Sequence, residues 1–340
     1  GRPKGIVQTQ RGRRDWAYDL ALALRYHGGA RTLLTIGLYS NISWVGMLCT
    51  LLAGGTIVVE SRFSADGFLD CVEAQGITHT VMVPVQYRQV LAAQLAGPRR
   101  GASLQSMMSC GSPLPENLKR GLCDVFPCGA IELYGLTEGI ITTLDPERAG
   151  GRWGSVGRPL PGTDLMIVGD DDQPVAAGAR GEIVARGRIT MPGYWARDEA
   201  SRAAEYIDPT GQQWLRSGDI GYLDEHGFLF IVDRKKDMIL SGGQNIFPQD
   251  IEAVLVDHED VADAAVIGLS SERWGETPVA VVVPAHERVD ADAIREWVNT
   301  RVGRQQRLAD VRLTDGLPRN PNGKILKREL RRAYGELRYE

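Results

Sequence analysis

The stretch Thr78–Leu95, THTVMVPVQYRQVLAAQL, decides the fold that we expect for this chain. Its first part, Thr78–Pro84, is a short apolar run typical of a buried strand, and Tyr87–Leu95 has the spacing of a helix. Further strands are expected at Thr32–Ile36, at Thr56–Val59, within SMMSCGSPLP (Ser106–Pro115) and within AIELYG (Ala130–Gly135). Strands that alternate with helices predict an α/β fold with a mostly parallel sheet.

One segment without charged residues, Thr32–Val59, is long enough to raise the question of a membrane helix. We interpret it as a strand, a loop, a helix around Trp44–Leu52 and a second strand, with Gly54 and Gly55 ending the helix. Buried parallel strands are continuously apolar because helices cover both of their faces. The sequence therefore predicts no membrane span.

The pattern changes twice along the chain. Residues 1–150 have the α/β pattern, whereas 151–233 consist of short strands with Asp and Gly turns, typical of a β-rich subdomain. A charged link, RKKD at 234–237, precedes a compact α+β pattern over 238–340. We expect the link to be a hinge and the last part to be a small mobile domain.

The composition excludes some classes of protein. The chain has 340 residues, 43% of them hydrophobic, and a net charge of −4, which argues against a dedicated nucleic-acid binder because phosphate binding needs a basic face. Its five cysteines include no C-x-x-C pair. A reduced, cytoplasmic protein is expected.

Two short segments follow predicted strand ends, where ligands collect in open α/β sheets. In YGLTEG (Tyr134–Gly139), a flat ring, the hydroxyl of Thr137 and the carboxylate of Glu138 can stack a base, hold a phosphate oxygen and coordinate Mg²⁺. CGSPLP (Cys110–Pro115) has small residues against which a planar ring can lie. Taken alone, YGLTEG is equally consistent with an ordinary turn, and CGSPLP alone favours a plain turn.

Three further segments carry candidate polar groups. RSGDIGY places Asp219 in a glycine-flanked turn suited to bind ribose hydroxyls. DRKKDMILSGGQNIFPQDIE offers the guanidinium of Arg234 and the pair Gly242-Gly243, and LPRNPNGKILKREL presents Lys324 before a basic helix. The alternatives are a solvated charged face for the second and a tight turn before an amphipathic helix for the third.

The first residues, GRPKG, have the composition of a turn that holds phosphate. Glycines let backbone N–H groups approach an anion, and Lys4 adds positive charge. From the residues alone, the segment is either a short basic arm or the end of a longer loop.

Taken together and in this order, the four segments YGLTEG, RSGDIGY, DRKKDMILSGGQNIFPQDIE and PRNPNGKILKREL resemble the signature motifs of the adenylate-forming superfamily. That superfamily contains acyl-CoA synthetases, non-ribosomal peptide adenylation domains and luciferases. Its members activate a carboxylate with MgATP to an acyl-adenylate and then transfer the acyl group to a thiol, commonly that of coenzyme A. The resemblance implies ATP, Mg²⁺ and coenzyme A. GRPKG resembles the second half of the family's phosphate loop, so we expect the chain to be truncated at its N-terminus.

The resemblance also implies roles for individual residues. Lys324 would bridge the substrate carboxylate and the α-phosphate, and Glu138 would hold Mg²⁺. The nucleotide would be bound by Lys4, Gly111, Ser112, Pro113, Tyr134, Gly135, Thr137, Asp219 and Arg234. Lys236 would be the hinge residue, and the loop for the pantetheine arm of coenzyme A would consist of Gly242, Gly243, Gln244 and Asn245.

The acyl pocket implied by the resemblance would be lined by Ser40, Trp44, Ser109, Cys110, Leu133, Gly139, Ile140 and Ile141. Amino-acid-activating relatives have an Asp where Tyr39 and Ser40 stand, so an amino-acid substrate is not expected, because a buried ammonium would lack a partner. Many acyl-CoA ligases have a His in place of Ser40. Leu133 stands where long-chain and coumarate-type ligases tend to have Gly, which favours a short, compact or simple aromatic acid.

Three functions stay open at this point. The leading hypothesis is an ATP-dependent acyl-CoA synthetase whose partners are a small carboxylic acid, ATP and coenzyme A. The second is an adenylation module that loads a carrier protein, and the third is a catalytically incomplete nucleotide-binding remnant of the family. A homodimer is left open.

Overall fold

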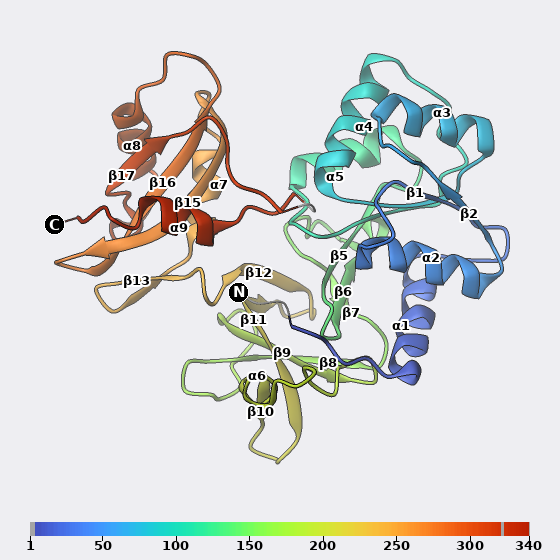
Figure 1. The fold of residues 1–340 in the computed structure, drawn as a ribbon, viewed down its shortest axis with the longest axis horizontal. Coiled ribbons are helices and arrows are strands. Elements are labelled where there is room, and N and C mark those ends of the chain that lie inside the picture. The colour runs from blue at the N-terminus through green and yellow to red at the C-terminus, as the bar shows by residue number, and fades with distance from the viewer. Residues whose placement is uncertain (1–3, 321–322, 340) are drawn as a thin grey trace. The chain divides into compact units, whose positions relative to one another are not determined.

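The structure is a computed structural model, and it describes residues 4–320 and 323–339 (Figure 1). It divides into two compact units. The first consists of the residues up to Ser217 together with Gly221–Ile231, and the second consists of Gly218–Ile220 together with the residues from Val232 onward. The predicted hinge at 234–237 therefore lies just inside the second unit.

The first unit contains a seven-stranded sheet with the strand order β2-β1-β3-β4-β5-β6-β7. Its strands are β1 (Arg31–Leu34), β2 (Thr56–Val59), β3 (His79–Met82), β4 (Ser106–Ser109), β5 (Ala130–Leu136), β6 (Ile140–Leu144) and β7 (Arg158–Pro159). Strands β2 to β5 pair with their neighbours in parallel, and β6 and β7 continue the sheet antiparallel. The predicted mostly parallel α/β fold is confirmed.

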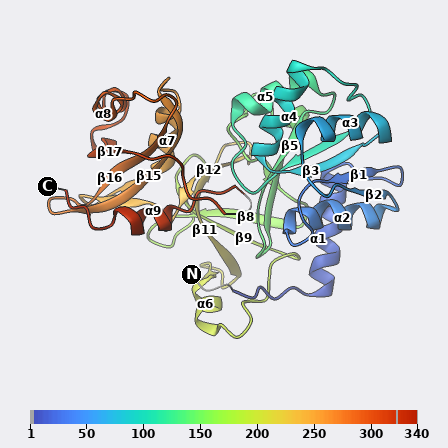
Figure 2. The ribbon, with the colours of Figure 1, turned by 45° about the horizontal axis from the view of Figure 1, so that its top comes forward.

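Helices cover both faces of this sheet. They are α1 (Gln10–Ala23), α2 (Asn41–Ala53), α3 (Ala65–Gln75), α4 (Pro84–Ala96) and α5 (Glu116–Val125). Helices α1 and α2 lie on one face and α3, α4 and α5 on the other (Figures 1 and 2). Leu34 and Met108 pack toward α1 and α2, whereas Leu33 and Met107, their strand neighbours, pack toward α3 to α5. Successive strand residues point to opposite faces, so β3 and β4 are buried at every position, including their polar residues such as His79 and Ser109.

Local signals position the elements around the quoted stretch. Pro84 is the first residue of α4, where its missing N–H costs no helical hydrogen bond. Gly54 ends α2 with a φ of 78°, as the sequence predicts. The charge-free segment is thus strand, helix and strand. None of the helices in the described part of the chain is both long and apolar enough to cross a membrane.

A β-rich part follows the parallel sheet; it belongs to the first unit except for Gly218–Ile220 and the residues from Val232 onward. It is a five-stranded sheet of β8 (Thr163–Val168), β9 (Gly181–Gly187), β10 (Glu205–Ile207), β11 (Gln213–Leu223) and β12 (Leu229–Arg234), with a short helix α6 (Asp198–Ala203) and a 3₁₀ turn at Pro146–Arg148. The pairs β8–β9 and β10–β11 are antiparallel. The predicted hairpin-rich texture is present here.

The second unit is an α+β domain with the strand order β14-β13-β16-β15 and with β17 beside β16. Its elements are β13 (Ile239–Ser241), β14 (Gln244–Ile246), α7 (Pro248–Leu255), β15 (Val261–Ser271), β16 (Gly275–Pro284), α8 (Ala291–Asn299), a 3₁₀ turn at Arg304–Gln306, β17 (Asp310–Leu313) and α9 (Lys327–Tyr334). One face of this sheet packs against α7 and α8, and the other packs against Leu330 of α9.

Candidate active site

The loop that follows β5 presents two of the predicted site residues. Gly139 has a φ of 107°, and a Cβ at this position would lie 2.1 Å from the carbonyl oxygen of Ile189. Only glycine permits this approach of two backbone segments. The tight turn from Leu136 to Gly139 leaves the side chain of Thr137 exposed and that of Glu138 half-buried.

Two distant segments hold this loop. The amide of Gln8 donates to the carbonyl oxygen of Thr137 over 2.8 Å, and the N–H of Met191 donates to that of Glu138 over 2.7 Å. The phenol of Tyr194 donates to Oε1 of Glu138 over 2.9 Å. Burial, with Glu138 adding to it, raises the pKa of Tyr194 far above its usual value, so the phenol stays protonated and remains a donor.

Lys4 joins the same cluster. Its Nζ lies 4.3 Å from the centre of the Tyr194 ring, a cation–π contact. The backbone around Lys4 runs beside the backbone around Tyr194, since the N–H of Trp195 donates to the carbonyl oxygen of Gly5. Lys4, Glu138 and Tyr194 thus gather at one place, while Gly1, Arg2 and Pro3 of the expected phosphate loop lie outside the described residues.

The turn after β4 lies next to the end of β5, because β4 and β5 are parallel neighbours. The N–H of Cys110 donates to the carbonyl oxygen of Met82, and the N–H of Leu114 donates to Oε1 of Glu132 over 2.8 Å. Between them, Gly111 and Pro113 are exposed, Ser112 is half-buried, and Gly111 has a φ of 96°. The predicted adenine turn and Tyr134, with Gly135 beside it, therefore share one edge of the sheet.

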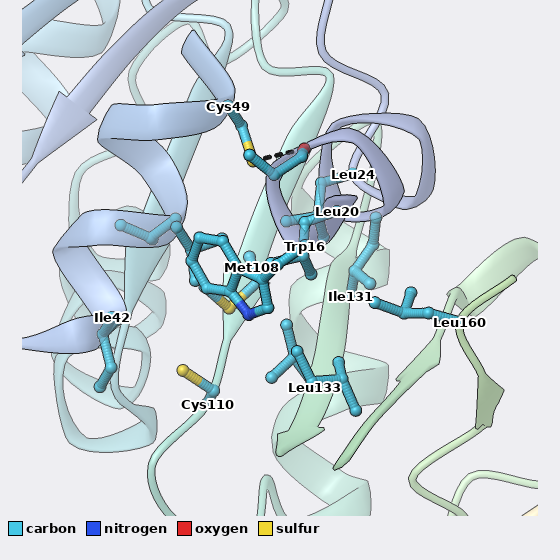
Figure 3. Packing of buried hydrophobic residues seen from close by; sticks show 14 of the residues in the cluster. Trp16, Leu20, Leu24, Ile42, Cys49, Met108, Cys110, Ile131, Leu133 and Leu160 are labelled. Atoms are coloured by element: carbon cyan, nitrogen blue, oxygen red, sulfur yellow. Dashed lines mark hydrogen bonds between the residues drawn. The ribbon is translucent and has the colours of Figure 1, made fainter. Parts of the chain in front are cut away.

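The residues of the predicted acyl pocket do not all come together. Cys110, Leu133 and Ile141 pack into one buried cluster with Ile42 and with Trp16 of α1, part of which is drawn in Figure 3. The other predicted positions have separate surroundings, as follows: Ile140 packs against Ala185 and Met191, Gly139 against Ile189, and Trp44 is 41% exposed.

Two serines of the predicted pocket behave differently. Ser40 is buried and caps α2, because its Oγ accepts a hydrogen bond from the N–H of Ile42. Ser109 is fully buried beside Cys110, and its Oγ has no hydrogen-bond partner within the part of the chain that the structure describes. An unpartnered buried hydroxyl is costly in a folded protein unless a ligand or water bonds it.

Three charged site residues lie together in the second unit. Nε of Arg234 is 2.8 Å from Oδ1 of Asp219, whose side chain is only 3% exposed. The pKa of Lys324 is lowered, chiefly by burial and next by the positive charge of Arg234, while Asp219 acts in the opposite direction. Asp219, Arg234 and Lys324 therefore form one electrostatic cluster. The turn that carries Lys324 is closed by the N–H of Lys324, which donates to Oδ1 of Asn320. Pro321 and Asn322 lie outside the described residues.

The predicted hinge, residues 234–237, forms a turn that is stabilised by contacts of Asp237, its last residue. The N–H groups of Asp237 and Met238 both donate to the carbonyl oxygen of Arg234, and Lys236, inside this turn, is exposed. Nη1 of Arg331, on α9, lies 2.8 Å from Oδ1 of Asp237.

Gly242 and Gly243 form the two-residue turn between β13 and β14. Their φ values are 56° and 78°, the combination that such a hairpin turn requires. Trp274 lies against this turn, since its carbonyl oxygen accepts from the N–H of Gly242 and a Cβ on Gly242 would be 2.9 Å from its ring. Gln244 and Asn245 follow on the exposed side of the hairpin.

Sequence reasoning did not identify Tyr194 and Trp16. Tyr194 is 56 residues from Glu138, and nothing in the local sequence GYW indicates that its phenol points at a carboxylate. Trp16 lies on α1, for which the sequence analysis assigned no helix. Both emerge only from the tertiary arrangement.

Comparisons with known proteins agree with this geometry. The family model described as AMP-binding enzyme matches residues 1–195, and that of the AMP-binding enzyme C-terminal domain matches residues 250–324. The chain is 36% identical to a feruloyl-CoA synthase of an Amycolatopsis species, over 98% of this chain and 68% of the relative. It is 38% identical to an indoleacetate–CoA ligase of Aromatoleum aromaticum, over 97% of this chain and 64% of the relative.

Solved structures give the same result. The o-succinylbenzoate CoA synthetase of Bacillus subtilis, in complex with its acyl-adenylate intermediate, superimposes with a TM-score of 0.87 at 31% identity, over 97% of this chain and 66% of that one. A further structure of that enzyme contains ATP and a magnesium ion. The chain belongs to the AMP-binding, adenylate-forming enzyme family. Within it, the chain falls in the class of AMP-forming acid–thiol ligases, and it spans about two thirds of the length of these relatives.

Proposed function

We propose that this protein is an ATP-dependent acid–CoA ligase that activates a compact or aromatic carboxylic acid through an acyl-adenylate. The observation that carries the proposal is the presence of two polar clusters built from the family's motifs. Lys4, Glu138 and Tyr194 form the first, and Asp219, Arg234 and Lys324 form the second. Each cluster supplies charges of the sign that a nucleotide triphosphate or its ribose requires.

The nucleotide would bind through groups whose orientation is already fixed. The carboxylate of Asp219 would accept hydrogen bonds from the ribose hydroxyls, and Arg234 orients this carboxylate by its 2.8 Å contact. The adenine ring would lie between Tyr134 and the Gly111–Pro113 turn, in which Gly111 and Pro113 are exposed. Because the turn has a positive φ at Gly111, the ring could approach its backbone closely.

In the first half-reaction, an oxygen of the substrate carboxylate would attack the α-phosphorus of ATP. The new P–O bond yields the acyl-adenylate, and the bond to pyrophosphate breaks. Negative charge accumulates on the phosphate oxygens, and the ammonium groups of Lys324 and Lys4 and the hydroxyl of Thr137 would stabilise it. Lys324 would need to stay protonated for this role; burial and the charge of Arg234 lower its pKa, and the carboxylate of Asp219 opposes that shift.

Magnesium fits this site as an ion shared with the substrate. The described residues contain no group of three or more His, Cys, Asp or Glu side chains placed to hold a metal, so Glu138 would be a single protein ligand beside ATP oxygens. Magnesium bound there would neutralise phosphate charge. Tyr194 orients the carboxylate of Glu138 for this purpose.

In the second half-reaction, the thiolate of coenzyme A would attack the acyl carbonyl carbon and AMP would leave. We assign the pantetheine arm to the hairpin turn at Gly242–Asn245, beside Trp274. The two glycines expose backbone N–H and C=O groups along which an extended chain can lie.

An apolar substrate agrees with the buried cluster around Cys110 and Leu133. Its members Trp16, Ile42 and Ile141 are apolar, and the hydroxyl of Ser109 adjoins it. The similar proteins are named for feruloyl, indoleacetate and o-succinylbenzoate groups. We therefore place aromatic acids first in the substrate panel.

The test is pyrophosphate release and thioester formation by the full-length gene product with a panel of carboxylic acids, ATP, Mg²⁺ and coenzyme A. We expect activity to peak among aromatic and short compact acids. A peak among long-chain fatty acids would contradict the substrate class, and no pyrophosphate release with any acid would contradict the ligase function. Acyl transfer to a carrier protein without coenzyme A would favour a carrier-loading module.

A further inference from the structure

A buried ion pair lies behind the turn that follows β4. Nζ of Lys119, on α5, is 2.5 Å from Oε2 of Glu132, on β5, and each side chain is only 4% exposed. Burial raises the pKa of Glu132, and the charge of Lys119 opposes that shift. Removing two charges from water costs several kcal/mol per ion, so an apolar pair of similar size would stabilise this core as well or better.

Both members of the pair also bond to backbone groups. Lys119 also donates to the carbonyl oxygens of Trp153, over 2.5 Å, and Ser155, over 3.1 Å. The ammonium of Lys119 is thus held by two carbonyl oxygens and by its ion pair with Oε2 of Glu132. The second carboxylate oxygen of Glu132 accepts from the N–H of Leu114 over 2.8 Å. One buried pair thus joins α5, β5, the turn at 110–114 and the turn at 153–155.

Leu114 is the point at which this junction meets the predicted adenine turn. The turn leaves β4 at Cys110, whose N–H donates to the carbonyl oxygen of Met82, and it ends at Leu114, which is 3% exposed. The segment Gly111–Pro113 is therefore held at both ends, and Glu132 supplies the attachment at the second end. Gly111 has a positive φ and carries no side chain, so these attachments fix its position.

We propose that the Lys119–Glu132 pair is a positioning device for nucleotide binding. Glu132 fixes the N–H of Leu114 and thereby the position of the adenine turn relative to Tyr134, which lies two residues further along β5. Lys119 fixes the carboxylate in the orientation that serves Leu114. Neither residue touches substrate. This inference rests on the proposed function, because it assigns the turn to adenine.

Two variants separate positioning from mere stability. Glu132→Gln keeps an oxygen that can accept from Leu114 but leaves the Lys119 ammonium without its counter-charge, so it should be less stable yet keep a KM for ATP close to that of the natural protein. Lys119→Met combined with Glu132→Leu removes both charges together, so it should be more stable than Glu132→Gln, which leaves one charge buried without its counter-charge. It also removes the acceptor for Leu114, so its KM for ATP should rise about fivefold to tenfold, the equivalent of one net hydrogen bond.

The measurements are KM for ATP, KM for the acid, kcat and the denaturant midpoint. Glu182→Gln is the matched control, because Glu182 is paired with Arg216 at 2.8 Å and its side chain is 6% exposed, but it lies in the β8–β9 hairpin sheet. It should lose stability without a change in KM for ATP. The proposal is wrong if KM for ATP follows stability across the three variants, or if both KM values rise together. A natural protein that releases no pyrophosphate would instead refute the ligase function.

Discussion

Replacing Gly139 with alanine should separate the Glu138 loop from the segment that carries Tyr194. The added Cβ would lie 2.1 Å from the carbonyl oxygen of Ile189 and 2.6 Å from Cα of Thr190. Both are backbone atoms and cannot rotate away. The segment 189–194 must therefore move, and the hydrogen bond of Tyr194 to Glu138 must lengthen.

The magnitude follows from two contributions. A side chain at positive φ costs about 1–2 kcal/mol, and overpacking that forces a backbone shift costs about 1–3 kcal/mol more. Gly178→Ala is the matched control, because Gly178 has a φ of 84° and a Cβ there meets nothing within 4 Å. We expect about 2–5 kcal/mol of lost stability for Gly139→Ala and only about 1–2 kcal/mol for Gly178→Ala.

The assay is urea unfolding of both variants together with KM for MgATP. Loss of the Tyr194 hydrogen bond should raise KM about fivefold or more in Gly139→Ala and leave it unchanged in Gly178→Ala. If the two variants lose equal stability, or if KM is the same in both, then the close approach at Gly139 does not position Glu138 and our reasoning about this loop is refuted.

Three further predictions concern single residues. His79 is fully buried, and burial lowers its pKa to about 4. Because the unfolded chain binds the proton near pH 6.5, up to about 3 kcal/mol of the free energy of unfolding should be lost as pH falls from 6.5 to 4. A His79→Gln variant that keeps the whole pH dependence of stability in urea titrations would contradict this. Tyr194→Phe should raise the Mg²⁺ concentration needed for half-maximal pyrophosphate release severalfold while KM for the acid stays constant; an unchanged Mg²⁺ requirement would show that Tyr194 does not orient Glu138. Gly243→Ala should slow thioester formation and spare adenylation, because its φ of 78° disfavours alanine in the hairpin turn; equal slowing of both half-reactions would count against the thiol assignment.

The sequence predicts the parallel sheet well for a physical reason. Strands buried on both faces, such as β3 and β4, contain no Lys, Arg, Asp or Glu and have apolar pairs at their centre or end, Val81-Met82 and Met107-Met108. That signal is visible without tertiary information. Helix α1 is not visible in the same way. It begins with QRGRRD, and its buried residues Trp16 and Leu20 form a face only once the sheet is present to cover it.

The candidate site is predictable where a motif carries both the residue and its local geometry. The Gly242-Gly243 turn is of this kind, since the glycines shape the turn themselves. The turn expected at Asp219 is wrong: Asp219 lies within strand β11, whose pairing with neighbouring strands the local sequence does not reveal. The contact of Tyr194 with Glu138 and the pair of Lys119 with Glu132 depend on the packing of elements far apart in the chain. In the sequence, Lys119 is simply one charged residue of a helix with charged neighbours, and nothing indicates that it is buried.

The most direct test of our mechanism measures the two half-reactions separately in a Lys324→Ala variant of the full-length protein. If the ammonium of this residue bridges carboxylate and phosphate, release of pyrophosphate from ATP and acid should be abolished, while a synthetic acyl-adenylate supplied with coenzyme A should still give thioester at close to the natural rate. Full pyrophosphate release by the variant, or equal loss of both half-reactions, would contradict the mechanism.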